Sequence, residues 1–210
     1  MRIVCTTCDG YSYIIPSFVH YFRKKWPQCP WPLTIVTNNK PIETDEEVFF
    51  SGSIRTFSDI LRKYIDREMQ HDELFLHLQE DYILEYVNHE VIMRAYGAMM
   101  ENPHIAYIRL NPYPPPTKPW ELSEIFGEQE RNTSYLISAQ ATIWRTAFIK
   151  TILTPGESGW DFEIKGSARA NICPVHNRFL CVYKPAMNWH NLMSKQREDP
   201  HVIQWVQENW

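Results

Sequence analysis

One stretch, Leu74 to Tyr82, constrains the fold of this chain most strongly, and it reads LFLHLQEDY. Its first five residues are apolar except for His77, and the run then ends in Gln79, Glu80 and Asp81. A nearly continuous apolar run of this length predicts a strand buried on both faces of a mostly parallel sheet. Open α/β sheets bind ligands at the carboxyl ends of such strands, and paired carboxylates there suit a divalent cation and a phosphate-bearing ligand. The alternative is that Glu80 and Asp81 only begin a solvated turn.

The first forty residues have the spacing of a strand, a helix and a second strand. Arg2 to Thr6 and Leu33 to Thr37 are rich in strand-forming residues, and Tyr11 to Lys25 between them carries apolar residues at helical spacing. This unit predicts two parallel strands joined by a right-handed crossover. The chain has no G-x-G-x-x-G and no G-x-x-x-x-G-K-[ST], so a Rossmann dinucleotide site or a P-loop is poorly supported.

The loop after the first strand is a candidate ligand-binding loop. A parallel sheet places it at the same edge as Glu80 and Asp81. It carries five polar or aromatic residues of interest: Thr6, Thr7, Cys8, Asp9 and Tyr11.

Two amphipathic helices are predicted on either side of the acidic strand. One is capped by Thr56 and runs to about Met69, and the other covers Asn88 to Met100. Arg62 and Lys63 lie beside the apolar face of the first helix. They form either a solvated helix face or, because this helix leads into the acidic strand, a contact to a diphosphate.

The second half continues the alternation. Strands are expected at Ile105 to Leu110, Tyr135 to Ile143 and Leu180 to Tyr183, and helices at Arg145 to Leu153 and Asp199 to Trp210. A proline-rich loop follows the first of these strands, and Tyr113 and Trp120 around it form either a sugar-stacking platform or part of a simple connector. A second acidic cluster of Glu157, Asp161 and Glu163 is either a solvated loop or a catalytic wall.

Composition excludes several classes of function. Hydrophobic residues make up 44% and charged residues 22%, which is typical of a globular chain with a sizeable core. A net charge of −4 without a basic patch argues against nucleic-acid binding, and no run is long enough to cross a bilayer. The first residues do not have the pattern of a secretory signal, and five cysteines without disulfide-framework spacing favour a reducing compartment. We therefore expect a cytoplasmic protein with no membrane contact.

The arrangement resembles the GT-A class of nucleotide-sugar glycosyltransferases. In that class a strand ends in an Asp-x-Asp type motif that binds a divalent metal and the diphosphate of the donor, and here Gln79-Glu80-Asp81 stands at that place. Gln79 replaces the first Asp, so the metal rests mainly on Asp81. The family often adds a histidine from a late loop, and His190 is the matching candidate. The resemblance implies an α/β fold with a mixed, mainly parallel sheet flanked by helices.

The resemblance also implies roles for the remaining candidates. Trp160-Asp161-Phe162-Glu163 is similar to the acidic motif before the acceptor-side helix, where inverting members keep their general base. Asp161 is the first choice for that base, followed by Glu163 and Glu157. The loop from Thr6 to Tyr11 would hold the uridine, with Tyr11 or Tyr13 stacking on the base, and Arg62 or Lys63 would hold phosphate.

A closer resemblance is to the N-terminal domain of chlorella-virus glycosyltransferases that glycosylate the major capsid protein. It rests on three motifs taken together, LFLHLQEDY, ISAQATIWR and TPGESGWDFE. It implies a UDP-glucose or UDP-rhamnose type donor, Mn²⁺ or Mg²⁺, a capsid glycan as acceptor, and action in the cytoplasm of an infected cell. Residues 1–210 would form one domain, with a nucleotide-sugar-binding half at 1–100 and an acceptor-binding half at 101–210. The lack of a polar tail after Trp210 is compatible with a domain cut from a longer protein.

Two other classes stay open at this point. A sugar nucleotidyltransferase would share the sheet and the acidic metal site, but it usually has a glycine-rich, basic phosphate loop, and the N-terminal loop offers only Gly10. A non-catalytic carbohydrate-binding module would explain the aromatic residues and the proline-rich loop without needing two acidic clusters.

Overall fold

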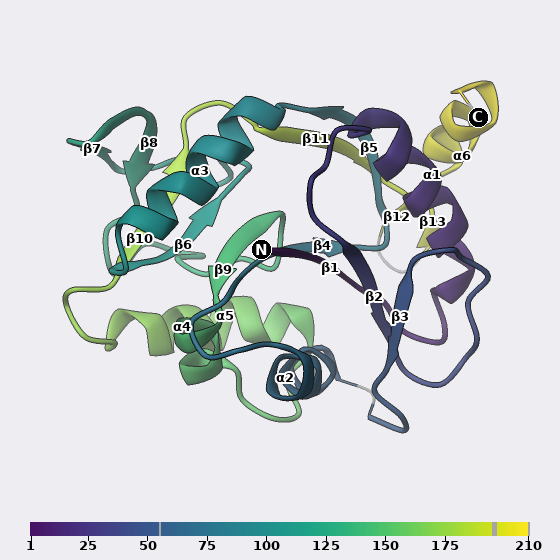
Figure 1. The fold of residues 1–210 in the computed structure, drawn as a ribbon, viewed down its shortest axis with the longest axis horizontal. Helices are drawn as coiled ribbons and strands as arrows, with labels where there is room; N and C mark the ends of the chain where they lie inside the picture. The colour runs from purple at the N-terminus through teal and green to yellow at the C-terminus, as the bar shows by residue number, and fades with distance from the viewer. Residues whose placement is uncertain (55, 195–196, 210) are drawn as a thin grey trace.

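A central sheet organises the chain in the computed structural model, which describes residues 1–54, 56–194 and 197–209 (Figure 1). Its strands are β1 (Arg2–Thr6), β2 (Leu33–Thr37), β3 (Glu47–Phe50), β4 (Leu74–Gln79), β6 (Ile105–Arg109), β7 (Lys118–Trp120), β8 (Ser123–Glu128), β9 (Thr142–Arg145) and β10 (Arg178–Val182). They lie in the order β3-β2-β1-β4-β9-β6-β10-β8-β7. Pairing is parallel from β3 to β4 and between β6 and β10, whereas β9 and β8 run against their neighbours. The sheet is therefore mixed, with most strands pointing the same way.

Helices cover both faces of this sheet (Figure 1). They are α1 (Ile15–Lys25) after the short 3-10 turn η1 (Ser12–Ile14), α2 (Phe57–Glu68), α3 (His89–Glu101), α4 (Thr146–Ile152), α5 (Gly159–Asn171) and α6 (Pro200–Asn209). The helices α2, α4 and α5 lie on one side, and α1 and α3 lie on the other. A two-stranded ribbon of β5 (Tyr82–Val87) and β11 (Met187–Asn191) joins the α1 side, and β12 (Met193–Ser194) pairs with β13 (Arg197–Glu198).

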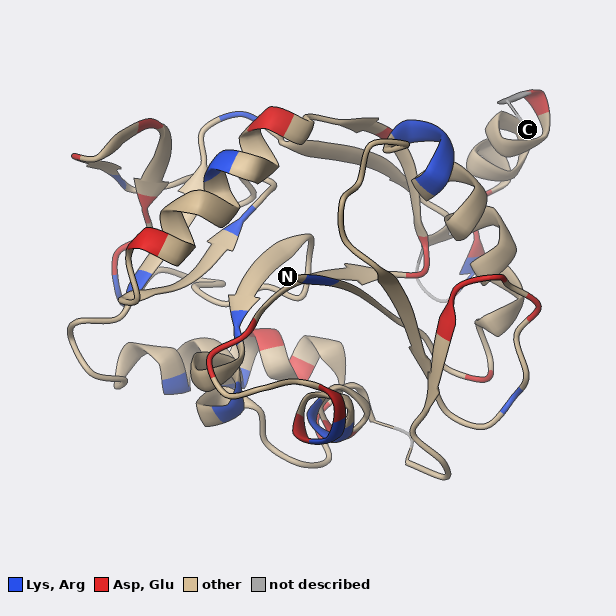
Figure 2. Ribbon diagram, in the orientation of Figure 1, with Lys and Arg blue, Asp and Glu red and all other residues tan. Residues whose placement is uncertain are grey.

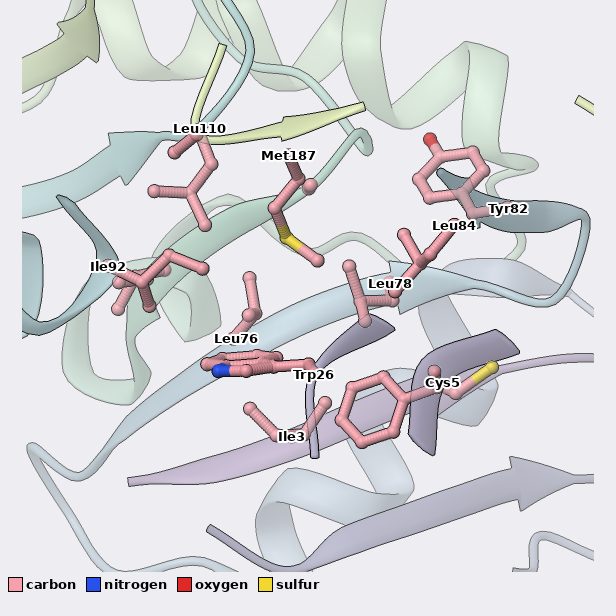
Figure 3. Packing of buried hydrophobic residues seen from close by; sticks show 14 of the residues in the cluster. Ile3, Cys5, Trp26, Leu76, Leu78, Tyr82, Leu84, Ile92, Leu110 and Met187 are labelled. Carbon is pink, nitrogen blue, oxygen red and sulfur yellow. The ribbon is translucent and has the colours of Figure 1, made fainter. Parts of the chain in front are cut away.

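The strand β4 is buried on both faces, as its apolar run predicts. Leu76 and Leu78 belong to the cluster on the α1 side, where Figure 3 shows them with Trp26. Phe75 packs in the other cluster, and the side chain of His77 is also buried. Each fully buried Leu or Phe contributes about 2 kcal/mol of transfer free energy, which fixes this strand in the middle of the sheet and its acidic end at the carboxyl edge.

Most of the predicted elements are confirmed. The first two strands have the predicted bounds, and α2 and α3 begin after Thr56 and Asn88, whose side chains accept hydrogen bonds from Asp59 N and Val91 N. The final helix also forms, although its predicted end at Trp210 lies outside the described residues. No helix within the described ranges combines the length and apolar character that crossing a bilayer requires.

The predicted strand from Tyr135 to Ile143 is wrong over most of its length, because only Thr142–Arg145 pairs in the sheet. Tyr135 has a positive φ of 54°, which interrupts an extended chain. The buried guanidinium of Arg109 donates to the carbonyls of Tyr135 and Leu136, and Ser167 Oγ accepts from Ile137 N. Side chains thus replace the ladder partners that a strand would need.

Candidate functional site

Three cavities follow one another along the carboxyl edge of β1 and β4. The outer cavity, of about 400 Å³, lies between the loops after β1 and β2 and is lined by Asp9, Asn38 and Asn39. The central cavity, of about 620 Å³, shares Cys8 with it. The tryptophan cavity, of about 640 Å³, shares Gln79 and Gly159 with the central cavity. The shared lining residues show that the three cavities adjoin one another along this edge.

The loop after β1 forms the wall between the outer and central cavities. Asp9 Oδ1 accepts hydrogen bonds from the backbone amides of Asn39 at 2.9 Å and Lys40 at 2.8 Å, and Asp9 N donates to Asn38 Oδ1 at 3.0 Å. Asp9 therefore joins the loops after β1 and β2 rather than presenting a free carboxylate. The other predicted loop residues all line the central cavity: Thr6, Thr7, Cys8 and Tyr11.

Glu80 and Asp81 turn the chain from β4 into β5 and place one carboxyl group in each of two cavities. Glu80 lines the central cavity and Asp81 the tryptophan cavity. Burial, with the charge of Asp81 second, raises the pKa of Glu80 to about 8, and burial raises the pKa of Asp81 to about 6. Two crowded carboxyl groups with raised pKa values form a strongly negative site once both are ionised, which is the electrostatic condition for binding a cation.

Two residues that line the tryptophan cavity each have a buried side-chain oxygen without a hydrogen-bond partner among the described residues. These oxygens are Asp81 Oδ1 and Gln140 Oε1. Leaving a buried polar atom unpaired costs about 1–3 kcal/mol, so native proteins rarely keep such atoms without a ligand or water. Both atoms can accept from a ligand that is rich in donors, and Asp81 Oδ1 is also a hard oxygen ligand for Mn²⁺ or Mg²⁺.

His190 is not among the residues that line the tryptophan cavity with Asp81. Alternation along β11 points Trp189 and Asn191 into the tryptophan cavity, whereas His190 contacts the ring of Trp205 at 4.6 Å and lies 3.7 Å from Glu85 Oε2. The described part of the chain contains no group of three His, Cys, Asp or Glu residues that could hold a metal ion. A cation held by Asp81 would therefore need the oxygen atoms of a bound phosphate and water to complete its shell.

Asp161 and Glu157 are both occupied by structural contacts. Ser158 and Asp161 form a capping box at the start of α5, so Asp161 and Glu163 lie on a helix, and only Glu157 lies in the loop before it. Lys165, followed by Ser158, lowers the pKa of Asp161 to about 2. Glu157 is buried and accepts from both guanidinium nitrogens of Arg169, at 2.9 and 2.5 Å. Asp161 is therefore a weak base, and Glu157 is held in a closed ion pair, so both are poor proton acceptors. This argues against the first and third choices for the general base.

Glu163 is the carboxylate of α5 that lines the tryptophan cavity together with Asp81. Its Oε1 accepts from Ser138 Oγ at 2.9 Å and from Ala139 N at 2.8 Å. Both bonds use the same oxygen, so the orientation of the carboxylate is fixed while Oε2 has no bond to the described residues. This geometry favours Glu163 as the proton acceptor.

Arg62 and Lys63 line none of the three cavities. Arg62 pairs with Asp66 at 2.9 Å and donates to the carbonyl of Lys150, and Lys63 donates to the carbonyl of Ser51 at 2.6 Å. Figure 2 shows basic and acidic segments side by side on α2. The structure thus supports the solvated-face interpretation for these two cations.

Aromatic residues form one wall of the tryptophan cavity, and the sequence points to Trp160 but not to the stacking role of Trp189 or Tyr82. Trp189 stacks on Tyr82 with ring centroids 4.3 Å apart and an interplanar angle of 18°, and its Nε1 donates to Asn191 Oδ1 at 2.8 Å. Trp160 lines the same cavity and is 72% exposed. Of the two alternatives for the proline-rich loop, the structure favours a connector, because Trp120 is buried against Phe126.

Several solved structures share the fold of this chain. The chain aligns over 100% of its length with S. aureus TarS 1–349, at a TM-score of 0.58 and 15% identity, and spans 64% of that chain. It aligns with the galactosyltransferase LgtC in complex with donor and acceptor sugar analogues (TM-score 0.51, 10% identity, 100% of this chain and 96% of that one). It also aligns with UDP-glucose pyrophosphorylase complexed with UDP-glucose (TM-score 0.52, 12% identity, 91% and 93% of the chains).

At these identities the similarity establishes the fold, and the predicted GT-A-like architecture is confirmed. No protein-family model matches the sequence, and no curated protein matches it significantly.

Proposed function

We propose that the chain is a metal-dependent glycosyltransferase that moves a hexose or deoxyhexose from a UDP-sugar to a glycan. One observation carries the proposal: Asp81 and Gln140, each with a buried and unpartnered side-chain oxygen, line the same aromatic-walled cavity, next to a second cavity of similar size. A polyhydroxylated ligand with a bound cation satisfies both oxygens, and two adjoining cavities accommodate a donor and an acceptor. The fold shared with LgtC, which is solved with donor and acceptor sugar analogues, agrees with this chemistry.

The outer and central cavities would hold the nucleotide. Tyr11 lines the central cavity and supplies a ring for stacking, and the Asp9–Asn38 bond fixes the loop around the base. The diphosphate would then lie against Glu80 and Asp81 at the carboxyl end of β4, where open α/β sheets bind their ligands.

A divalent cation fits this edge because Asp81 Oδ1 is a buried oxygen without a partner in the described chain. Asp81, with Glu80 second, would hold it, and its charge would offset the negative charge that develops on the departing diphosphate, an effect worth several kcal/mol. Mg²⁺-type sites commonly use one or two carboxylates and the phosphates of the substrate. We therefore expect weak metal binding by the protein alone and stronger binding with a nucleoside diphosphate.

Glu163 would take the proton from the acceptor hydroxyl. Its Oε1 is held by two hydrogen bonds, so the second oxygen is positioned for a hydroxyl in the cavity. A positioned base contributes about 10²–10⁴-fold to the rate. A base that activates an acceptor for direct attack on the anomeric carbon gives inversion, so we propose an inverting reaction.

The tryptophan cavity would bind the sugar rings. The CH-rich face of a pyranose packs on an aromatic ring, and Trp189 is held rigid by Tyr82 and Asn191. Trp160, mostly exposed, extends this aromatic surface towards solvent. A rigid aromatic surface beside polar side chains suits a glycan acceptor longer than one sugar.

The finer assignment rests on sequence resemblance alone. It comprises a UDP-glucose or UDP-rhamnose type donor, the glycan of a viral capsid protein as acceptor, and action in the cytoplasm of an infected cell. A nucleotidyltransferase is the main rival, because UDP-glucose pyrophosphorylase has the same fold. However, no Lys or Arg is among the described residues that line the central cavity, whereas a nucleoside triphosphate would bring more negative charge there than a diphosphate.

The test is Asp81→Asn, with the exposed Glu124→Gln as a matched control. We expect Mn²⁺ to strengthen UDP binding to the wild-type chain and to the control, measured by calorimetry. In Asp81→Asn, the gain in affinity from Mn²⁺ should fall at least about tenfold, because the cation loses its charged ligand. An unchanged gain in that variant would contradict the metal assignment.

A further inference from the structure

His77 is a buried ionisable residue that the proposed reaction does not use. It lies near the carboxyl end of β4, and its side chain faces away from the α1 side, against the ring of Phe57 at 5.5 Å. Both ring nitrogens are engaged: Nε2 lies 2.9 Å from Thr6 Oγ1, and Nδ1 lies 3.1 Å from the carbonyl oxygen of Ala139. One imidazole therefore bridges the strand β1 and the segment before β9.

The partners determine which nitrogen carries the proton. A carbonyl oxygen only accepts, so Nδ1 must carry the hydrogen that bonds to Ala139. Burial lowers the pKa of His77 to about 4, so the ring is neutral at pH 7 and Nε2 is an acceptor. The hydroxyl of Thr6 must then donate to Nε2.

This assignment sets the hydrogen-bonding character of the central cavity. Thr6 lines that cavity, and a hydroxyl has one hydrogen and two lone pairs. Since the hydrogen is used by His77, Thr6 Oγ1 can only accept from a ligand. The cavity wall is thereby matched to a ligand N–H or O–H, such as the N3–H of uracil or a ribose hydroxyl, and mismatched to an acceptor atom at the same place.

The other nitrogen leads to the proposed base. The carbonyl of Ala139 accepts from His77 Nδ1 and from Gln79 Nε2 at 3.3 Å, while Ala139 N donates to Glu163 Oε1. Ala139 lies outside regular secondary structure, so these bonds take the place of a strand ladder. Holding Ala139 therefore also holds the amide that orients the carboxylate.

We propose that His77 is a positioning residue for both the nucleotide and the proposed base. Through Nε2 it fixes Thr6 as a hydrogen-bond acceptor toward the nucleotide, and through Nδ1 it holds Ala139, which supports Glu163. The inference rests on the proposed function, because it takes the central cavity for the nucleotide site and Glu163 for the base. It predicts that Nε2 of His77 mainly affects the affinity for UDP and that Nδ1 mainly affects turnover.

Two substitutions separate the nitrogens. The side-chain amide of Asn ends near the position of Nδ1 and can keep the bond to Ala139, whereas the longer Gln ends near Nε2 and can keep the bond to Thr6. We expect His77→Asn to weaken UDP binding by about fivefold, the value of one hydrogen bond, with a smaller effect on turnover. We expect His77→Gln to act mainly on turnover, lowering UDP-glucose hydrolysis by about tenfold or more.

A purely structural role would give a different result. Each substitution removes one buried hydrogen bond, so both variants should lose similar thermal stability, and a structural role would then lower affinity and turnover in parallel in both. That parallel loss would overturn the proposal.

If a His77 variant does not fold, Thr6→Val and Thr6→Ser test the nucleotide side instead. Loss of UDP affinity in the Val variant and its retention in the Ser variant are expected, and equal affinities would refute the role of the hydroxyl.

The nitrogen-15 spectrum of the His77 ring tests the proton assignment without any ligand. We expect Nδ1 to carry the hydrogen and Nε2 to have the shift of an unprotonated nitrogen, and the reverse assignment would overturn the proposal. Failure of the wild-type chain to bind UDP would refute the proposed function while leaving this tautomer measurement intact. Normal UDP binding with no separation between the Asn and Gln variants would refute the role of His77 alone.

Discussion

Glu80→Gln should stabilise the chain in the absence of metal and nucleotide. Burial of the Glu80 carboxyl group, with the nearby charge of Asp81 second, disfavours its ionisation. These effects raise its pKa from an ordinary value of 4.5 to about 8 in the folded chain. The folded state holds this proton more tightly than the unfolded state does. Wild-type stability should therefore be unaffected by Glu80 below pH 4.5, and it should fall as the pH rises from 4.5 to 8.

The size of the effect follows from the pKa difference. One pKa unit corresponds to about 1.4 kcal/mol. Between pH 4.5 and pH 7 the unfolded chain loses the proton of Glu80 while the folded chain keeps it, so the free energy of unfolding falls by about 3 kcal/mol. Gln keeps the shape of the protonated side chain and does not ionise. At about 2–4 °C per kcal/mol for a chain of this size, we expect the Glu80→Gln melting temperature to exceed that of wild type by roughly 6–12 °C at pH 7.

The assay is thermal and urea unfolding of both proteins at pH 5, 7 and 8.5, without metal or nucleotide. The difference between them should be small at pH 5 and should grow up to pH 8.5. Glu124→Gln removes an exposed carboxylate and should shift stability by less than about 0.5 kcal/mol at every pH. A constant difference between Glu80→Gln and wild type across this range, or a less stable variant, would refute the argument that burial, with the charge of Asp81 second, disfavours ionisation of Glu80 in the folded chain.

Three further predictions concern the carboxylates of the site and its aromatic wall. Glu163→Gln should lower turnover by at least about a hundredfold with UDP affinity retained, whereas Asp161→Asn should cost about 1 kcal/mol of stability through its capping box and lower turnover less. Steady-state kinetics would contradict the base assignment if the two effects on turnover were reversed. Trp189→Ala should weaken binding of a glycan acceptor by about tenfold, measured as KM for the acceptor, and an unchanged KM would exclude the stacking role. Glu157→Gln breaks a buried ion pair with Arg169 and should lower stability by about 3 kcal/mol in urea unfolding, and a variant as stable as wild type would contradict its structural role.

The sequence predicts the parts of the site that depend on local sequence pattern, namely the acidic end of β4 and the loop after β1. The apolar run before Gln79 identifies a buried strand, and the strand–helix–strand spacing of the first forty residues places the loop from Thr6 to Tyr11 at the same sheet edge. Because the two strands are parallel, their carboxyl ends lie at the same edge of the sheet, which brings these separate sequence positions together. No contact between distant residues had to be known for that step.

The sequence-based choices of His190 and Asp161 took account of neither strand pairing nor local capping. His190 differs from Trp189 by one position on β11, and the face of each is set by pairing with β5, which no sequence pattern shows. Asp161 is three residues after Ser158, which is the spacing of a capping box, so this signal was present in the sequence. Glu163, by contrast, becomes the better base only through hydrogen bonds to Ser138 and Ala139.

The most direct test of the proposed function is calorimetric titration of UDP into the wild-type chain with and without Mn²⁺. The acidic turn of Glu80 and Asp81 at the edge of the central cavity predicts binding that is much tighter with the metal than without it. Absence of binding under both conditions would contradict a UDP-dependent enzyme and favour a carbohydrate-binding module built on the tryptophan cavity.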